Sequence, residues 1–425
     1  MAQRPIREYH TKRMLAEHWK FYFGGLTPYE ARMVLVCPDT DLEEVVREHG
    51  WLTGSRLVVK PDQLFGKRGK NRLILVDGSV EQGLDWIRER MNREITVGGI
   101  ADTLTHFLME EFVPHDGEFY VAIQSDREED RILFSPHGGV EIEDLWDTVK
   151  TVSVSVGDDL DIDVLTGSLS ECLPGEDIPE VRQFVAGLYR FFRDLHFTYL
   201  EINPFAVTKD SVKPLDAVAR LDDTAHFKCV EKWGDIDFPA PFGLHLSSEE
   251  AYIKDLDKKS GASLKLTVFN PEARVWTLIA GGGASVIYAD TIVDLGFGRD
   301  LANYGEYSGN PSTDETYEYV KTILGLMCTH PDPRGKILII GGGIANFTDV
   351  NSTFTGMIKA LEDFGTQFRD HKVSIYVRRG GPNYKEGLEN LRGAVENLGI
   401  PIRVYGPELH MTKIVTTALA DNGGN

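Results

Sequence analysis

The stretch VWTLIAGGGASVIYAD, residues 275–290, decides the fold of the second half of this chain. Val275–Ala280 is a short apolar run that predicts a buried strand, three glycines end it, and the residues after them have helical spacing. The same order recurs at the apolar runs Lys336–Ile340, Val373–Val377 and Ile400–Tyr405. Such alternation of strands and helices predicts a doubly wound parallel sheet.

The turns that follow these strands predict a site for an anion. GGGIANFT follows the second strand, RRGG follows the third, and the first runs into Gly281, Gly282 and Gly283. In an open parallel sheet these turns meet at the carboxyl ends of the strands, where helix N-termini attract anions. They would gather Asn346, Thr348 and at least one of Arg378 and Arg379, which suits a small molecule with several carboxylates.

Two other interpretations of these turns are open. Glycine used only for tight turns explains one triplet well and two less well. A dinucleotide site would need the third glycine of G-x-G-x-x-G, which both GGGASV and GGGIAN lack. We therefore favour the anion site.

The first half of the chain mixes helices and strands irregularly. Residues from about Ile6 to Phe23 have helical spacing, and charged turns such as Asp126–Asp130 favour hairpins. Strands are predicted at Arg56–Lys60, Arg72–Val76, Phe119–Ser125 and Arg131–Ser135. This pattern predicts a largely antiparallel α+β region.

A linker is predicted at WGDIDFPAPFGLHL, residues 233–246, because two prolines and two glycines stand there between the two patterns. We therefore expect two domains, at residues 1–235 and 236–425. The expected fold class is α/β, with an α+β domain followed by a doubly wound one.

A basic loop in the first half indicates a phosphate site. It is not a P-loop, because the sequence has no G-x-x-x-x-G-K-[ST] string. Lys60 ends an apolar strand, and Lys67, Arg68, Gly69 and Lys70 follow before the next strand. Side-chain charge and backbone N–H groups on such a loop can wrap a triphosphate. A solvated basic turn is an equally good interpretation of the pattern alone.

The segment TYLEINPFAVTKDSVKPLDAVARLD, residues 198–222, predicts a symmetric hairpin around Lys209–Asp210. That register puts Asn203 opposite Asp216, with Glu201 on the same face. A carboxylate and an amide oxygen that converge on one face suit Mg²⁺, which takes few protein ligands and binds phosphate oxygens besides. Polar residues on the wet face of a hairpin are the commoner alternative.

The charge and cysteine content exclude several classes of partner. A formal charge of −21 repels nucleic-acid backbones and anionic lipid, so we expect neither nucleic acid nor membrane as a partner. The four cysteines show no C-x-x-C spacing, which indicates buried free thiols in a reducing compartment. With no signal-like or long apolar segment, we expect a cytoplasmic protein.

A series of motifs resembles one family in chain order. VVKPDQ, KRGK, FVPH, TYLEINP, WGDIDFP, KSGASLKL, ANYGEYSG, GGGIANFT and VRRGGPN are similar to the N-terminal half of ATP-citrate lyase, over nearly the whole chain. The wider superfamily is succinyl-CoA synthetase, whose β subunit has an ATP-grasp domain followed by a flavodoxin-like domain. The resemblance implies this same two-domain architecture.

The resemblance also implies roles for residues in the first half. It places Glu201 towards a phosphohistidine and Mg²⁺ on Asn203 and Asp216. It implies that ATP is bound by Lys60, Arg68, Gly69, Glu110, Glu111, Val113 and Glu118.

In the second half of the chain, the resemblance implies a second cation at Asp257, Ser260 and Ala262. It also implies a phosphate site at the helix start formed by Gly281–Gly283. Citrate would be bound by Ser308, Gly309, Asn346, Thr348 and Arg379.

Two parts of the family's machinery are not found in this sequence. None of its twelve histidines stands in a G-H-A-G-A-type loop, and no citrate-synthase-like module is present. We therefore expect a hetero-oligomer, in which a partner chain carries the phosphohistidine, the CoA-binding module and the citrate-synthase-like module. CoA would be a cosubstrate with ATP. The alternatives are a β subunit of a citryl-CoA synthetase or of a succinyl-CoA-type ligase, and a non-catalytic carboxylate-sensing scaffold.

Overall fold

The computed structural model describes residues 3–139, 142–172, 179–208 and 211–423. It divides into two compact units, Met1–His245 and Leu246–Asn425. The division falls inside the segment 233–246, where the sequence predicts a linker; the domain boundary at 235/236 stays a prediction. In the described ranges, no helix combines the length and apolarity needed to span a bilayer.

The second unit is built on one sheet with strand order β14-β16-β15-β17-β18-β19. Neighbouring strands run parallel from β16 to β19, whereas β14 is antiparallel to β16. The bounds are β14 Ser263–Val268, β15 Val275–Ala280, β16 Asn303–Ser308, β17 Ile337–Gly342, β18 Ser374–Arg378 and β19 Ile402–Tyr405. The predicted strand at 275–280 is thus confirmed residue for residue.

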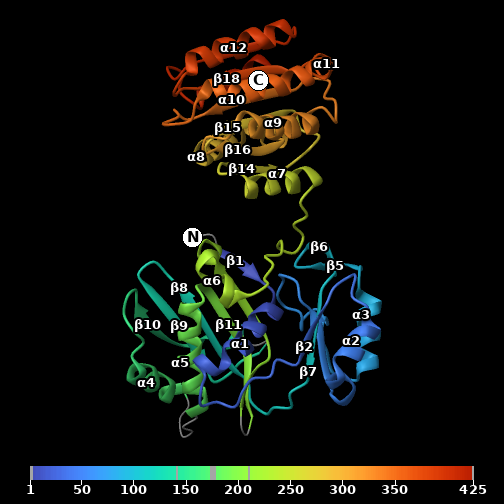
Figure 1. The fold of residues 1–425 in the computed structure, drawn as a ribbon, viewed down its shortest axis with the longest axis vertical. Helices are drawn as coiled ribbons and strands as arrows, with labels where there is room; N and C mark the ends of the chain where they lie inside the picture. The colour runs from blue at the N-terminus through green and yellow to red at the C-terminus, as the bar shows by residue number, and fades with distance from the viewer. Residues whose placement is uncertain (1–2, 140–141, 173–178, 209–210, 424–425) are drawn as a thin grey trace. The chain divides into compact units, whose positions relative to one another are not determined.

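Helices cover both faces of this sheet (Figure 1). Alternate residues of each strand enter different cores: Trp276 packs with the core of α9 and α10, and Val275 with that of α8 and α13. The predicted doubly wound sheet is therefore confirmed. The helices are α7 Ser248–Lys259, α8 Gly282–Ile292, α9 Thr313–Met327, α10 Val350–Asp363, α11 Gly365–Asp370, α12 Tyr384–Asn397 and α13 Lys413–Asp421.

Two helix boundaries in this unit follow from single residues. The spacing of Ser312 and Glu315 predicts a capping box, and the two residues form it at the start of α9, since each side chain receives a hydrogen bond from the other's backbone N–H. Helix α8 begins at Gly282, because Gly281 has a φ of 96° that favours glycine. The helical spacing predicts a helix from Ala284 to Leu295, stopped by Gly296. This end is wrong: α8 ends at Ile292, and a wider turn, Val293–Phe297, contains the left-handed Gly296.

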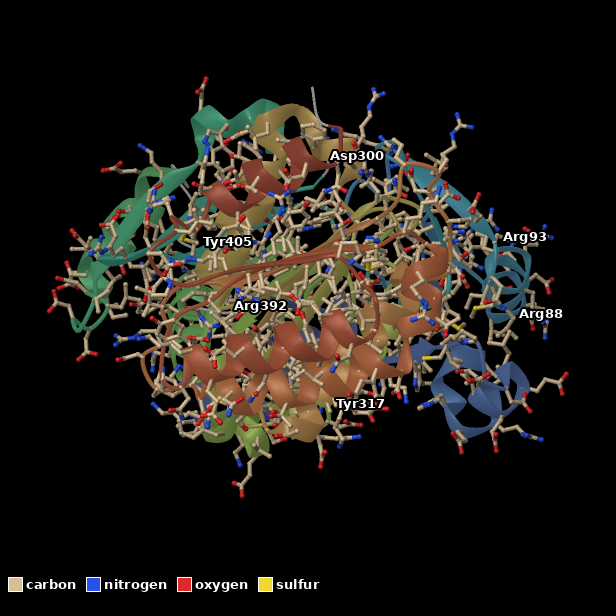
Figure 2. The ribbon with its side chains drawn as sticks, turned by 90° about the horizontal axis from the view of Figure 1, so that it is seen from above. Arg88, Arg93, Asp300, Tyr317, Arg392 and Tyr405 are labelled. Carbon is tan, nitrogen blue, oxygen red and sulfur yellow. The ribbon has the colours of Figure 1, made fainter. Side chains whose placement is uncertain are left out.

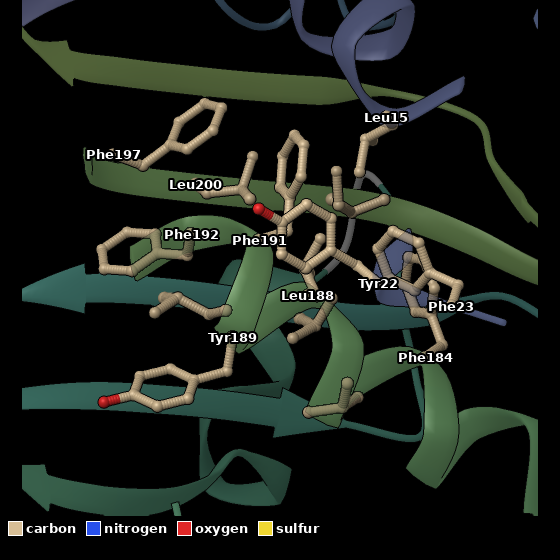
Figure 3. Close-up of a cluster of buried hydrophobic side chains, with 14 of the residues drawn as sticks. Leu15, Tyr22, Phe23, Phe184, Leu188, Tyr189, Phe191, Phe192, Phe197 and Leu200 are labelled. Atoms are coloured by element: carbon tan, nitrogen blue, oxygen red, sulfur yellow. The ribbon is translucent and has the colours of Figure 1, made fainter. Parts of the chain in front are cut away.

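In the first unit, a large sheet has strand order β1-β13-β11-β8-β9-β10, with β12 paired to β11. All these pairs are antiparallel, as predicted. Helix α5 packs phenylalanines such as Phe184 and Phe191 against α1 and β11 (Figure 3). The bounds are β1 Gln3–Ile6, α1 Glu8–Tyr22, β8 Phe119–Ser125, β9 Glu129–Ser135, β10 Lys150–Ser155, α4 Ile162–Cys172, α5 Pro179–Asp194, β11 Phe197–Thr208, β12 Ser211–Pro214, β13 Ala217–Asp222 and α6 His226–Trp233.

A small sheet with order β2-β7-β3-β4 lies beside the large one in this unit (Figure 1). Helices α2 and α3 flank it; Ile87 of α3 is buried, while Arg88 faces solvent (Figure 2). The bounds are β2 Met33–Val36, α2 Leu42–Glu48, β3 Leu57–Pro61, β4 Leu75–Gly78, α3 Val80–Arg90, β7 Phe107–Glu111 and the hairpin β5 Glu94–Val97 with β6 Ile100–Thr103.

The predicted strand start at Arg72 is wrong by three residues. Lys67 and Arg72 both adopt left-handed backbone angles, with φ of 61° and 58°. Between them a compact turn forms, in which Asn71 N donates to Lys67 O and Leu73 N to Arg68 O. The chain therefore extends only from Leu75, and the basic residues stay on a loop.

Candidate functional site

A cavity of about 550 Å³ lies between the large and small sheets of the first unit. Strands β3 and β7 and the β3–β4 loop contribute residues from one side, and β11 to β13 contribute them from the other. The structure brings to this cavity every residue predicted to bind ATP, and also Glu201 and the two predicted Mg²⁺ ligands. They are Lys60, Arg68, Gly69, Glu110, Glu111, Val113, Glu118, Glu201, Asn203 and Asp216.

The predicted hairpin register is observed at the strand pairs on either side of the Asn203–Asp216 position. Phe205 pairs with Pro214 and Ile202 with Ala217, so Asn203 stands opposite Asp216, and Asn203 N donates to Asp216 O over 3.1 Å. The turn Lys209–Asp210 itself lies outside the described residues. Asn203 Oδ1 accepts a hydrogen bond of 2.7 Å from Gly139 N. Asn203 and Asp216 both line the cavity, from paired positions of the hairpin.

A buried charge cluster forms the floor of this cavity. Lys60 Nζ lies 2.7 Å from Glu8 Oε1, 2.9 Å from Glu110 Oε1 and 2.8 Å from Leu215 O. Lys12 Nζ reaches the same three groups, at 2.7 Å from Glu8, 2.6 Å from Glu110 and 2.8 Å from Leu215 O. Two ammonium groups thus share one set of acceptors, which fixes both lysines.

Arg68 joins this cluster from the β3–β4 loop. Its Nη2 donates to Glu8 Oε2 over 2.9 Å and to Asp216 Oδ1, while its Nη1 donates to Pro61 O. Burial raises the pKa of Asp216 to about 6; Arg68 lowers it and Glu8 raises it. The formal charges of Glu8, Glu110 and Asp216 balance those of the two lysines and the arginine.

Sequence reasoning missed Glu8 and Lys12, although a signal was present. Positions 8, 12, 15 and 19 fall on one face of α1, and all four side chains are buried. A charged pair at i and i+4 on an otherwise apolar helical face indicates buried partners elsewhere in the fold. Here those partners are Lys60, Arg68 and Glu110.

We expect Glu8→Gln to lower the free energy of unfolding of the first unit by about 3 kcal/mol, because removal of one partner leaves buried cations unbalanced. Burial raises the pKa of Glu8, but Lys12, Lys60 and Arg68 outweigh it and hold that pKa well below its ordinary value of 4.5. Its stabilisation is therefore complete above pH 4.5 and is lost as the pH falls below that value.

Urea unfolding of the full chain at neutral pH and below pH 4.5 measures both effects. The matched control is Glu17→Gln on the same helix, where an exposed carboxylate pairs only with Arg13; we expect a change under about 0.5 kcal/mol. Equal stability of Glu8→Gln and the control would show that the cluster does not stabilise the fold.

A second cavity, of about 300 Å³, lies at the carboxyl ends of β15 to β18 in the second unit. The chain leaves β15 for β16 on one side and continues to β17 on the other, so the strand order reverses there, where ligands bind in such sheets. The predicted residues that line it are Gly281, Gly283, Ser308, Gly309, Thr348 and Arg379. Asn346 is exposed and does not line this cavity; its role stays a prediction.

The start of α8 differs from the expected set of three glycine N–H groups. Gly281 N donates to Tyr307 O over 3.0 Å, so this group is not available to an anion. Ser285 N donates to Gly281 O as the first hydrogen bond of the helix, which leaves the N–H groups of Gly282, Gly283 and Ala284 in the open first turn. The Glu306 carboxylate lies beside them: a Cβ on Gly282 would stand 2.9 Å from it.

The structure distinguishes the two adjacent arginines. All three nitrogens of the Arg378 guanidinium donate to loop carbonyls, those of Leu409, Gly342 and Pro407. Arg379 lines the cavity, is only 3% exposed, and donates from Nη1 to Gly343 O over 2.6 Å. Arg378 therefore holds the loops together, whereas Arg379 faces the cavity.

Comparison with known proteins identifies the family. The ATP-citrate synthase ATP-grasp domain matches residues 2–233, and the ATP citrate lyase citrate-binding domain matches residues 244–421. The chain is 46% identical to ATP-citrate synthase alpha chain protein 2 of Arabidopsis thaliana, over 99% of this chain and 98% of that one. The chain belongs to the ATP-citrate synthase family. The resemblance drawn from its motifs is confirmed.

Other members of the ATP-citrate synthase family extend this picture. The chain is 50% identical to the ATP-citrate synthase of Homo sapiens over 90% of its own length, but this covers only 35% of the human protein. The solved structure of ATP citrate lyase from Methanothrix soehngenii, in complex with citrate and coenzyme A, is 48% identical. It superposes with a TM-score of 0.88 over 99% of this chain and all of that one, which confirms the α/β fold with an ATP-grasp domain.

The second cation position expected from the ATP-citrate lyase resemblance lies where α7 meets β14. There Asp257 accepts from Leu264 N over 2.8 Å and pairs with Lys265, while Ser260 Oγ accepts from Ala262 N over 2.9 Å. The side-chain oxygens of Asp257 and Ser260 thus serve the local turn. A cation at Asp257, Ser260 and Ala262 stays a prediction.

Proposed function

We propose that this chain is the ATP- and citrate-binding subunit of ATP-citrate lyase, which converts citrate, ATP and CoA to acetyl-CoA, oxaloacetate, ADP and phosphate. It would act through a phosphohistidine on a partner module, then through citryl phosphate and citryl-CoA. The observation that carries the proposal is the first cavity, whose walls hold all ten residues that the family resemblance assigns to ATP, Mg²⁺ and catalysis.

In the first unit, Lys60 and Arg68 would neutralise the phosphates of ATP, since phosphoryl transfer depends mainly on positioning and charge neutralisation. Asn203 and Asp216 fit Mg²⁺, because an amide and a carboxylate side chain line the cavity from paired positions of the hairpin. Bound there, Mg²⁺ would offset phosphate charge. Ion pairs with Glu8 and Glu110 hold Lys60 in place for this task.

In the second unit, Arg379 would bind a citrate carboxylate, with Ser308, Gly309 and Thr348 on the same cavity wall. Open N–H groups at the start of α8 would bind the phosphate that arrives on the partner's histidine. The solved relative from Methanothrix soehngenii, which is in complex with citrate and coenzyme A, supports citrate here as well.

Exposed apolar side chains support a partner module. Val286 and Ile287 on α8 and Ile344 and Phe347 on the loop after β17 are 44–70% exposed, around the second cavity. Exposed large apolar residues grouped near a site indicate a protein interface. We therefore propose a hetero-oligomer in which the partner supplies the phosphohistidine, the CoA-binding module and the citrate-synthase-like module. A cytoplasmic location stays a prediction.

Product analysis of the complex reconstituted with its co-purifying partner tests this function. With citrate, Mg-ATP and CoA, we expect acetyl-CoA and oxaloacetate. Free citryl-CoA as the final product would favour a citryl-CoA synthetase, and turnover of succinate instead of citrate would favour a succinyl-CoA-type ligase. Citrate binding without any ATP consumption would indicate a carboxylate-sensing scaffold.

A further inference from the structure

Two buried donors on the wall of the second cavity lack a hydrogen-bond acceptor. They are the Tyr307 hydroxyl and Arg379 Nε: the Arg379 guanidinium lies beside the Tyr307 oxygen, but no described residue accepts the proton of either donor. Both residues line the cavity, and they are 0% and 3% exposed. Because buried polar groups are nearly always paired, two unpaired donors on one wall indicate a ligand that brings acceptors.

Tyr307 is held rigidly at this wall. It lies near the end of the buried strand β16, and its carbonyl accepts from Gly281 N over 3.0 Å. Its ring centroid is 6.2 Å from that of Tyr319. The Tyr319 hydroxyl, in contrast, donates to Lys265 O over 2.9 Å. The Tyr319 hydroxyl therefore has an acceptor in the protein, whereas the Tyr307 hydroxyl has none among the described residues.

The surroundings of the Tyr307 hydroxyl make it a donor. Burial raises its pKa above the ordinary value, although the neighbouring Arg379 guanidinium acts in the opposite direction. The hydroxyl thus keeps its proton at neutral pH and can donate it to an acceptor. An acceptor that satisfies both a hydroxyl and a guanidinium is a carboxylate, which has two oxygens.

We infer that Tyr307 is a further ligand-binding residue, whose hydroxyl donates to the same substrate carboxylate that Arg379 binds. This inference rests on the proposed function and deepens it. The Tyr307 hydroxyl would help the site to select a carboxylate over an uncharged substituent beside Arg379. A site built to bond such a group discriminates strongly against analogues that leave its donors unpaired.

Tyr307→Phe tests the inference, since it removes a buried hydroxyl whose proton has no acceptor among the described residues. The thermal midpoint of the chain should stay equal or rise, because an unpaired buried hydroxyl is lost. The citrate dissociation constant, measured by calorimetry on the full chain, should rise roughly 10- to 100-fold, as for a lost hydrogen bond to a charged group. ATP binding should not change.

The matched control is Tyr319→Phe, which removes a hydroxyl that the protein itself uses. It should lower the thermal midpoint and leave citrate affinity unchanged. Unchanged citrate affinity in Tyr307→Phe would overturn the inference; if Arg379→Ala nevertheless loses citrate, the proposed citrate site stands without Tyr307. If neither variant alters citrate affinity, both the inference and the proposed citrate site are wrong. The inference would also be overturned if Tyr307→Phe lowered the thermal midpoint as far as Tyr319→Phe, because the Tyr307 hydroxyl would then stabilise the fold itself.

Discussion

Arg379→Ala is expected to raise the citrate dissociation constant roughly 30- to 1000-fold, which corresponds to about 2–4 kcal/mol. Arg379 is 3% exposed and lines the second cavity; its Nη1 donates to Gly343 O, and its guanidinium lies beside the Tyr307 hydroxyl. Arg379 is the cationic residue among those that line this cavity, and its remaining N–H groups can bind a carboxylate. Titration calorimetry of the full chain measures the loss, and ATP affinity should stay at the wild-type value.

Arg392→Ala is the control for loss of one positive charge from the same unit. Arg392 lies exposed on α12 (Figure 2), and its replacement should change neither ligand affinity. Arg379→Lys separates charge from geometry, because lysine keeps the charge but loses the planar fork, so we expect an intermediate affinity. Wild-type citrate binding by Arg379→Ala would contradict the assignment of citrate to this cavity.

Asp216→Ala is expected to slow phosphoryl transfer from Mg-ATP to the partner roughly a hundredfold or more. Its carboxylate is the charged member of the Asn203–Asp216 pair, and without it the cavity wall offers Mg²⁺ only a neutral amide oxygen. Phosphorylation of the partner in a single turnover measures the effect. Citrate affinity should not change, since the Asp216 cavity lies within the first unit.

Two variants separate loss of the metal from loss of structure. Asp216→Asn retains an oxygen at the same place, so a higher Mg²⁺ concentration should restore part of its rate, whereas Asp216→Ala should recover less. Asp85→Ala, at an exposed carboxylate of α3 that pairs with Arg88, should be fully active. A normal rate for Asp216→Ala would remove this residue from the metal site.

The parts of the site that the sequence predicted depend on local periodicity. Strand pairing has a period of two, so a symmetric hairpin was enough to place Asn203 opposite Asp216. The second cavity was predictable because parallel strands end at one edge, and this brings Gly281, Thr348 and Arg379 together from the turns after separate strands.

The parts that the sequence did not predict depend on distant contacts. Burial of Glu8 and Lys12 depends on Lys60 and Glu110, which are 48 to 102 residues away along the chain. Adjacent arginines fall on opposite faces of a strand, but periodicity does not say which face holds the cavity, so it left Arg378 and Arg379 both open and only the family resemblance named Arg379. In the sequence, Tyr307 cannot be distinguished from an ordinary core residue. Only the structure shows that its hydroxyl proton has no acceptor among the described residues.

In the proposed function, this chain uses ATP to phosphorylate a partner's histidine, and that phosphate is then transferred to citrate. The most direct measurement adds ATP labelled at the γ-phosphate to the chain and its partner, then follows the label after citrate, succinate or buffer is added. We predict label on a partner histidine only when the chain and Mg²⁺ are both present, and rapid loss of that label with citrate alone. An unlabelled partner, or a label that succinate discharges as fast as citrate, would contradict the account.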